Sequence, residues 1–117
     1  MQRIDLKTAP ELVRVIRAAD STYRKHQATL CALETVSLSN TYWDGGSRST
    51  YTAVCLTTGR NKGAPQYDPP QFGGPATAPT VAIPEGIAIV ETGVFMGKTA
   101  TARVYVNPAN MAKLLTA

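Results

Sequence analysis

The segment from Tyr42 to Ser49 has the residue types of an anion-binding turn. Two aromatic side chains, Tyr42 and Trp43, precede Gly45-Gly46, and Arg48 follows them. Glycines let backbone N–H groups approach an oxyanion closely, and an arginine can hold a phosphate through two parallel hydrogen bonds. An aromatic face can stack on a nucleobase. The segment therefore predicts a site for a phosphorylated ligand; the alternative is a Trp43–Arg48 cross-strand pair that only stabilises a hairpin.

A second cluster with the same residue types lies closer to the C-terminus. Phe95 and Gly97 precede Lys98, and Arg103 follows five residues later. The alternative interpretation of Lys98 is an ordinary exposed turn lysine. Together the two clusters give the residues that we expect to contact a ligand: Tyr42, Trp43, Gly45, Gly46, Arg48, Phe95, Lys98 and Arg103.

Residues suited to catalysis are few. His26 is the one histidine of the chain, so it is the one ordinary general-base candidate. A His26–Cys31 pair competes with a simpler interpretation, an exposed histidine and a packed cysteine. The carboxylates form no paired motif, and no Walker sequence, dinucleotide-binding glycine fingerprint or Cys-x-x-Cys pair is present. We therefore expect a binding protein that is not an enzyme and uses no metal and no cofactor.

Size and charge limit the remaining classes. The chain has 117 residues, of which 44% are apolar and 17% charged, which predicts one globular domain over residues 1–117. No apolar run is long enough to span a membrane and the first residues do not resemble a secretory signal, so we expect a cytoplasmic location. The formal net charge is +4. The basic helix residues Arg14, Arg17 and Arg24 leave a nucleic-acid-binding module as an alternative, although so modest a charge makes it weaker.

The hydrophobic pattern predicts an α+β fold. Residues 8–25 have the spacing of an N-terminal helix, with Pro10 in its first turn. Apolar and polar residues then alternate over 30–38 and 50–57, and Gly45-Gly46 between them favours a hairpin turn. In that hairpin Cys31 and Cys55 lie roughly 16 Å apart, so we expect two free thiols.

Order is expected to return after a long Pro- and Gly-rich loop over residues 58–84. Ile87 to Glu91 and Thr99 to Val106 predict a second hairpin, and Asn107 caps a short C-terminal helix with Pro108 at its first position. The predicted architecture is an N-terminal helix, an antiparallel sheet of two hairpins and a short C-terminal helix. An assembly protein that clasps its neighbours with the 58–84 loop is a further alternative.

At its two clusters the sequence resembles the anti-Thoeris nucleotide-sponge family of small phage and prophage proteins. The resemblance lies in Tyr42 to Ser49 with Tyr51, and in Val90 to Gly93 leading to Phe95-Met96-Gly97-Lys98. It implies a homo-oligomer with pockets at subunit junctions, which binds a cyclic ADP-ribose-type immune signal without cleaving it. It also implies that the ligand is contacted by Trp43, Arg48, Phe95, Lys98 and Arg103.

Overall fold

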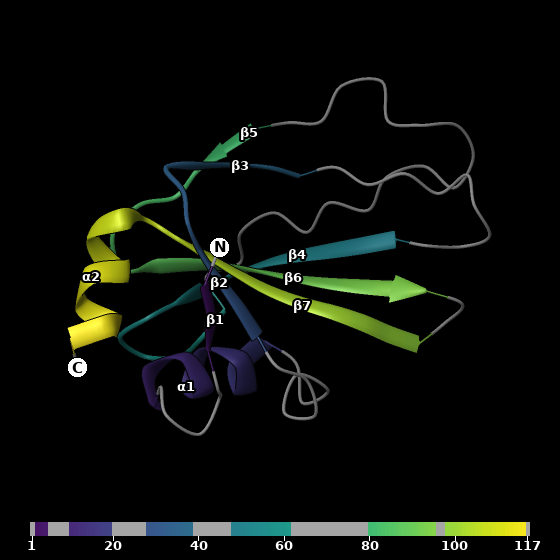
Figure 1. The fold of residues 1–117 in the computed structure, drawn as a ribbon, viewed down its shortest axis with the longest axis horizontal. Helices are drawn as coiled ribbons and strands as arrows, with labels where there is room; N and C mark the ends of the chain where they lie inside the picture. The colour runs from purple at the N-terminus through teal and green to yellow at the C-terminus, as the bar shows by residue number, and fades with distance from the viewer. Residues whose placement is uncertain are drawn as a thin grey trace.

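The chain folds as an α+β domain, seen here in a computed structural model (Figure 1). The structure describes residues 2–4, 10–19, 28–38, 48–61, 80–95 and 98–116. At residues 2–4, 48, 94–95, 98–102 and 115–116 it describes the backbone without the side chain. The elements are β1 (Gln2–Ile4), α1 (Pro10–Ala19), β2 (Ala28–Ala32), β3 (Thr35–Ser37), β4 (Arg48–Cys55), β5 (Thr80–Ala82), β6 (Ile87–Phe95), β7 (Lys98–Val106) and α2 (Pro108–Thr116).

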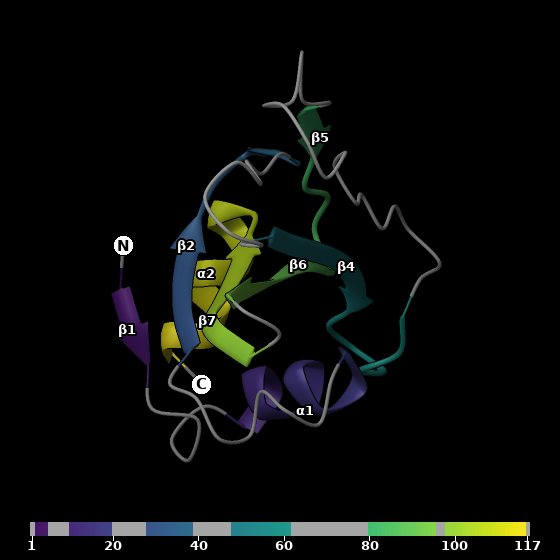
Figure 2. The same ribbon diagram turned by 90° about the vertical axis from the view of Figure 1, so that its right-hand side faces the viewer.

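Five of these strands form one mixed sheet in the order β1-β2-β7-β6-β4. The β2–β7 pair is parallel and the other pairs are antiparallel. β3 and β5 form a separate two-stranded antiparallel sheet. Figures 1 and 2 show α1 against one face of the large sheet and the β3–β5 pair on the opposite side.

Each face of the large sheet has its own apolar core. Leu12, Val15 and Ile16 of α1 are almost completely buried, and they pack with apolar residues of β2, β4, β6 and β7. Burial of a side chain of this size stabilises a fold by about 2 kcal/mol. On the other face, the β3–β5 pair covers a second core that contains Leu38 and Ile89. The central strands are therefore buried on both sides, which suits the nearly continuous apolar run at the start of β6.

Several sequence predictions are confirmed. The fold class is α+β, with a helix near each end of the chain and strands between them. The predicted second hairpin is β6–β7, with Ala88 opposite Val106 and Phe95 opposite Lys98. Asn107 caps α2, because its Oδ1 accepts a hydrogen bond from the Ala109 N–H at 3.0 Å. Both cysteines are free.

The predicted first hairpin is wrong. β4 pairs with β6 along its whole length, from Arg48 opposite Val94 to Cys55 opposite Ile87. The apolar first half of β6 needs an apolar neighbour on each edge, and β4 supplies one. The local preference of Gly-Gly for a tight turn stabilises a hairpin less than burial of the apolar half of β6 stabilises the β4–β6 pairing.

The predicted strand over 30–38 divides in two. β2 joins the large sheet beside β7, whereas β3 pairs with β5. The break falls at Leu33 and Glu34, and the Glu34 carbonyl accepts a hydrogen bond from the Ile83 N–H at 2.9 Å. β5 lies inside the segment predicted as a loop, of which residues 62–79 lie outside the described ranges. Within the described ranges, neither helix has the length and apolarity needed to cross a membrane.

Candidate functional site

Three of the predicted ligand residues meet at one end of the large sheet. Arg48 begins β4, Phe95 ends β6 and Lys98 begins β7. In the sheet register Arg48 lies opposite Val94, next to the Phe95–Lys98 pair. We call this the motif end, defined by Arg48, Phe95 and Lys98. The four remaining residues of the first cluster, Tyr42, Trp43, Gly45 and Gly46, lie outside the described residues.

The motif end joins two clusters that are far apart in the sequence. The predicted hairpins would have kept the clusters on separate turns. The observed β4–β6 pairing instead places the start of β4 beside the β6–β7 connection. The register therefore brings the backbone of both clusters to the same end of the sheet.

Arg103, the last predicted ligand residue, lies farther along β7 and is paired with a carboxylate. Its Nη1 is 3.7 Å from Oε1 of Glu91, the residue opposite it in the register. The Arg103 side chain is 44% exposed and that of Glu91 is 9% exposed. The Arg103 guanidinium therefore contacts Glu91 and is also partly exposed to solvent.

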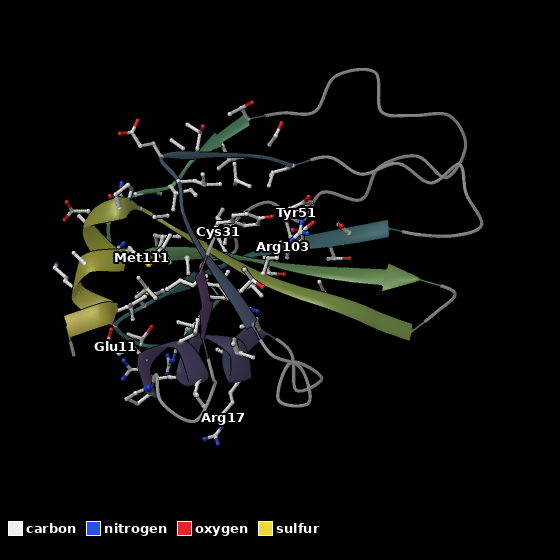
Figure 3. The ribbon with its side chains drawn as sticks, in the orientation of Figure 1. Glu11, Arg17, Cys31, Tyr51, Arg103 and Met111 are labelled. Carbon is white, nitrogen blue, oxygen red and sulfur yellow. The ribbon has the colours of Figure 1, made fainter. Side chains whose placement is uncertain are left out.

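Glu91 is the centre of a hydrogen-bonded cluster on the β3–β5 side of the sheet. The Tyr51 hydroxyl donates to Glu91 Oε2 at 3.1 Å, and the Tyr105 hydroxyl donates to Oε1 at 2.5 Å. Tyr51, Glu91 and Arg103 occupy one row of the register across β4, β6 and β7. Figure 3 shows Tyr51 and Arg103 near one another close to the middle of the sheet. We call these four residues the Glu91 cluster.

The ionisation of the Glu91 cluster follows from its burial. Desolvation, and then the charge of Glu91, raises the pKa of Tyr51 to about 12. Desolvation followed by the hydrogen bond to Glu91 also raises the pKa of Tyr105. Both phenols therefore keep their protons at neutral pH and donate them to the carboxylate. A hydrogen bond to Tyr105 raises the pKa of Arg103, which stays charged.

This arrangement is suited to positioning a cation. Each carboxylate oxygen of Glu91 accepts a hydrogen bond from one tyrosine hydroxyl, which fixes the orientation of the carboxylate. Its charge attracts the Arg103 guanidinium and limits the directions that the side chain can take. Sequence reasoning missed Tyr51, Tyr105 and Glu91 as a unit. Alternation alone puts Arg103 and Tyr105 on one face, but the position of Glu91 depends on the register of β6 against β7.

The two free cysteines differ in reactivity. Cys31 is buried, and desolvation raises its pKa. Cys55 is partly exposed at the end of β4, with its Sγ 3.2 Å from Thr57 Oγ1. Hydrogen bonds from Thr57, and then from Thr58, lower the pKa of Cys55 to about 6. The two free thiols therefore lie in different surroundings, with Cys31 buried and Cys55 partly exposed.

The sequence also offered His26 as a general-base candidate, and metal ligands can be examined in the described ranges. His26 lies outside them, so a His26–Cys31 pair stays a prediction. Among the residues that the structure describes, no three His, Cys, Asp or Glu side chains are grouped to hold a metal ion.

Comparison of the chain with protein-family models, with curated proteins and with solved structures finds no match in any of the three. The assignment of function therefore depends on the residues themselves.

Proposed function

We propose that the protein binds a small anionic nucleotide, of the cyclic ADP-ribose or cyclic oligonucleotide class, and sequesters it without cleaving it. In a phage-encoded protein this activity would remove an immune signal from the host cytoplasm and so counter host defence. The observation that carries the proposal is the convergence of Arg48, Phe95 and Lys98 on one end of three adjacent strands.

The residue types at the motif end suit such a ligand. Arg48 and Lys98 are cations placed singly beside glycines and aromatic residues, a pattern that fits a few phosphates better than a long polyanion. Arg103 adds a cation whose charge is partly balanced by Glu91. Nothing in this set supplies a nucleophile next to a base, which favours binding over hydrolysis.

A homo-oligomer with shared pockets is part of the proposal. A ligand of nucleotide size needs a pocket of roughly 300 Å³ or more. A second copy of the chain placed over the motif end would supply the rest of the pocket wall and exclude water from the phosphates. The aromatic residues of the first cluster would then contribute from one subunit or the other.

Calorimetry with cyclic ADP-ribose isomers and cyclic oligonucleotides tests the proposal. At least one ligand should bind, and Arg48→Ala and Lys98→Ala should each weaken it about tenfold or more, because each removes a charged hydrogen-bond donor. Arg17→Ala is the matched control, since it removes an exposed cation from α1 and should leave the affinity unchanged. Heat denaturation of the complex should release the ligand intact.

The same variants separate the alternatives. Binding of an oligonucleotide that falls with salt and depends on Arg17 but not Arg48 would indicate a nucleic-acid-binding module. Arg14 is less informative for this purpose, because its Nη2 already donates to the Leu56 carbonyl at 3.2 Å. Failure of every nucleotide to bind, with an oligomer that persists in Arg48→Ala, would indicate an assembly protein and would contradict the proposal.

A further inference from the structure

A pocket lies at the opposite end of the sheet from the motif end, between the two helices. It measures about 340 Å³ and is open to solvent. Its wall comes from α1, the turn after β4, the turn before β6, and α2. The lining includes four polar or charged residues and two leucines: Glu11, Glu85, Asn110, Lys113, Leu56 and Leu114. We call this the helix pocket.

Hydrogen bonds hold the four segments of the helix pocket together. The Leu56 N–H donates to the Gly86 carbonyl at 2.7 Å, which joins the two turns. Arg14 of α1 donates to the Leu56 carbonyl at 3.2 Å, and Asn107 Nδ2 at the start of α2 donates to the Ile83 carbonyl at 3.0 Å. The pocket is therefore formed before any ligand enters.

Asn110 gives this pocket an unused hydrogen-bond donor. The residue is 4% exposed, and its Nδ2 has no hydrogen-bond partner among the residues that the structure describes. The neighbouring backbone donors of α2 are already used, since the N–H groups of Asn110 and Met111 both donate to the Asn107 carbonyl. Buried amide groups are almost always paired, so this one calls for an acceptor. Asn110 is one of the residues that line the pocket, so an acceptor that enters the pocket comes close to this amide group.

The other lining residues define the ligand chemistry. Lys113 lies one turn after Asn110 on α2, so the amide donor and the cation come from one helix. The wall also contains two carboxylates, those of Glu11 in α1 and Glu85 in the turn before β6. Leu56 and Leu114 add an apolar surface. A ligand that carries an anionic acceptor, a cation and a short apolar group matches all three features.

We propose that the helix pocket binds an α-amino acid with an apolar side chain. Its carboxylate accepts a hydrogen bond from Asn110 Nδ2 near the charge of Lys113. Its ammonium group lies near the carboxylates of Glu11 and Glu85, and its side chain packs on Leu56 and Leu114. This site is separate from the nucleotide site, because the β4, β6 and β7 strands run their full length between the two.

Titration of the ¹⁵N-labelled full chain with L-leucine, L-methionine and L-phenylalanine tests this proposal. At least one amino acid should shift the amide resonances of Thr57, Gly86 and Asn110 saturably, with little change at the motif end. The deaminated and the amidated analogues of that amino acid should each bind about tenfold more weakly, because each lacks one of the two charges. No saturable shift at the pocket with any of the three amino acids would overturn the proposal. Equal binding of the deaminated acid would overturn it as well.

Two variants assign the effect to Asn110. Asn110→Leu keeps the branched shape and removes the donor, and Asn110→Asp replaces the donor by a negative charge. Both should lose about tenfold or more in amino acid affinity. Ala109→Asp is the charge-matched control on an exposed position of the same helix and should keep the affinity. Unchanged binding in both Asn110 variants would contradict the proposal, whereas failure of Arg48→Ala to affect nucleotide binding would concern the motif end alone.

Discussion

The motif end and the helix pocket lie at opposite ends of the same three strands, yet they are built from different kinds of information. At the motif end, residues with obvious chemistry gather within two short stretches of sequence. In the helix pocket, single residues from four separate segments meet, and hydrogen bonds to backbone carbonyls hold those segments together. The comparison shows that clusters of chemistry can be found in a sequence, whereas a pocket enclosed by distant segments depends on the fold.

The Glu91 cluster lies between the two ends and connects them through β4, β6 and β7. Its carboxylate is buried with two tyrosine hydroxyls and a guanidinium around it. Removing that carboxylate is the most disruptive way to test whether the two ends act separately.

Glu91→Leu should have the largest effect on stability. It leaves two mostly buried tyrosine hydroxyls without their acceptor, and we expect a loss of about 2–4 kcal/mol in the free energy of unfolding. Urea denaturation measures this loss. We also expect weaker nucleotide binding, because Arg103 loses its partner, with amino acid binding in the helix pocket unchanged. An equal loss of both activities would mean that the two ends are one unit.

The pH dependence of the two tyrosines should sharpen the same comparison. A pKa that folding raises makes the protonated phenol stabilising, so this stability is fully present below about pH 10. It should be lost as the pH rises through about 12, the pKa of Tyr51. Absorbance titration at 295 nm should show a late-ionising component that Tyr51→Phe and Tyr105→Phe each reduce. A titration in which all tyrosines ionise together near pH 10 would contradict the buried hydrogen bonds.

Asn110→Leu should have a smaller effect, in the stabilising direction. The substitution removes a buried donor without a described partner and keeps the branching of the side chain. We expect a gain of about 1 kcal/mol in the free energy of unfolding, measured by urea denaturation without added amino acid. With the bound amino acid present in excess, the advantage should shrink or disappear, because the ligand stabilises the wild type more than the weaker-binding variant. A destabilised Asn110→Leu would show that Asn110 has a structural partner.

Alkylation of the folded protein, which we expect at Cys55 alone, should leave stability nearly unchanged and distinguish the surroundings of the two cysteines. Cys55, with a pKa of about 6, should react with iodoacetamide in the folded protein at a rate that levels off above pH 7. Cys31 should react only after unfolding, because it is buried and its pKa is raised. Mass spectrometry of peptides after brief labelling measures both. Thr57→Val should raise the pH at which Cys55 reacts, since it removes the largest cause of the lowered pKa.

The features that could be predicted from the sequence are local ones. The N-terminal helix with Pro10 in its first turn, the Asn107 cap of α2 and the β6–β7 hairpin each depend on residues a few positions apart. The pairing of β4 with β6 could not be predicted in this way. The Gly45-Gly46 turn signal favoured a hairpin in which the strand over 50–57 pairs with the nearer strand over 30–38. The energy that decides between the two pairings comes from burial on both faces of β6, which is a property of the assembled sheet.

The candidate site shows the same division. The types of Arg48, Lys98 and Arg103 identified them as candidates for binding an anion, but their relative positions followed from the register. Glu91 looked like an isolated acid in a mostly apolar strand until the register placed it opposite both Tyr51 and Arg103. No sequence motif singled out Asn110. The lack of a hydrogen-bond partner for its Nδ2 depends on the residues packed around it in the fold.

The parallel pairing of β2 with β7 has a consequence for how the chain is made. β2 lies early in the sequence, and its neighbour β7 is the last strand of the described residues. During synthesis on the ribosome, the β7-facing edge of β2 has no partner until the residues of β7 have also emerged. Pairing over such a separation slows folding and exposes the waiting edge to other chains. The centre of the sheet is therefore expected to close late, as the final step that commits the newly made chain to its fold.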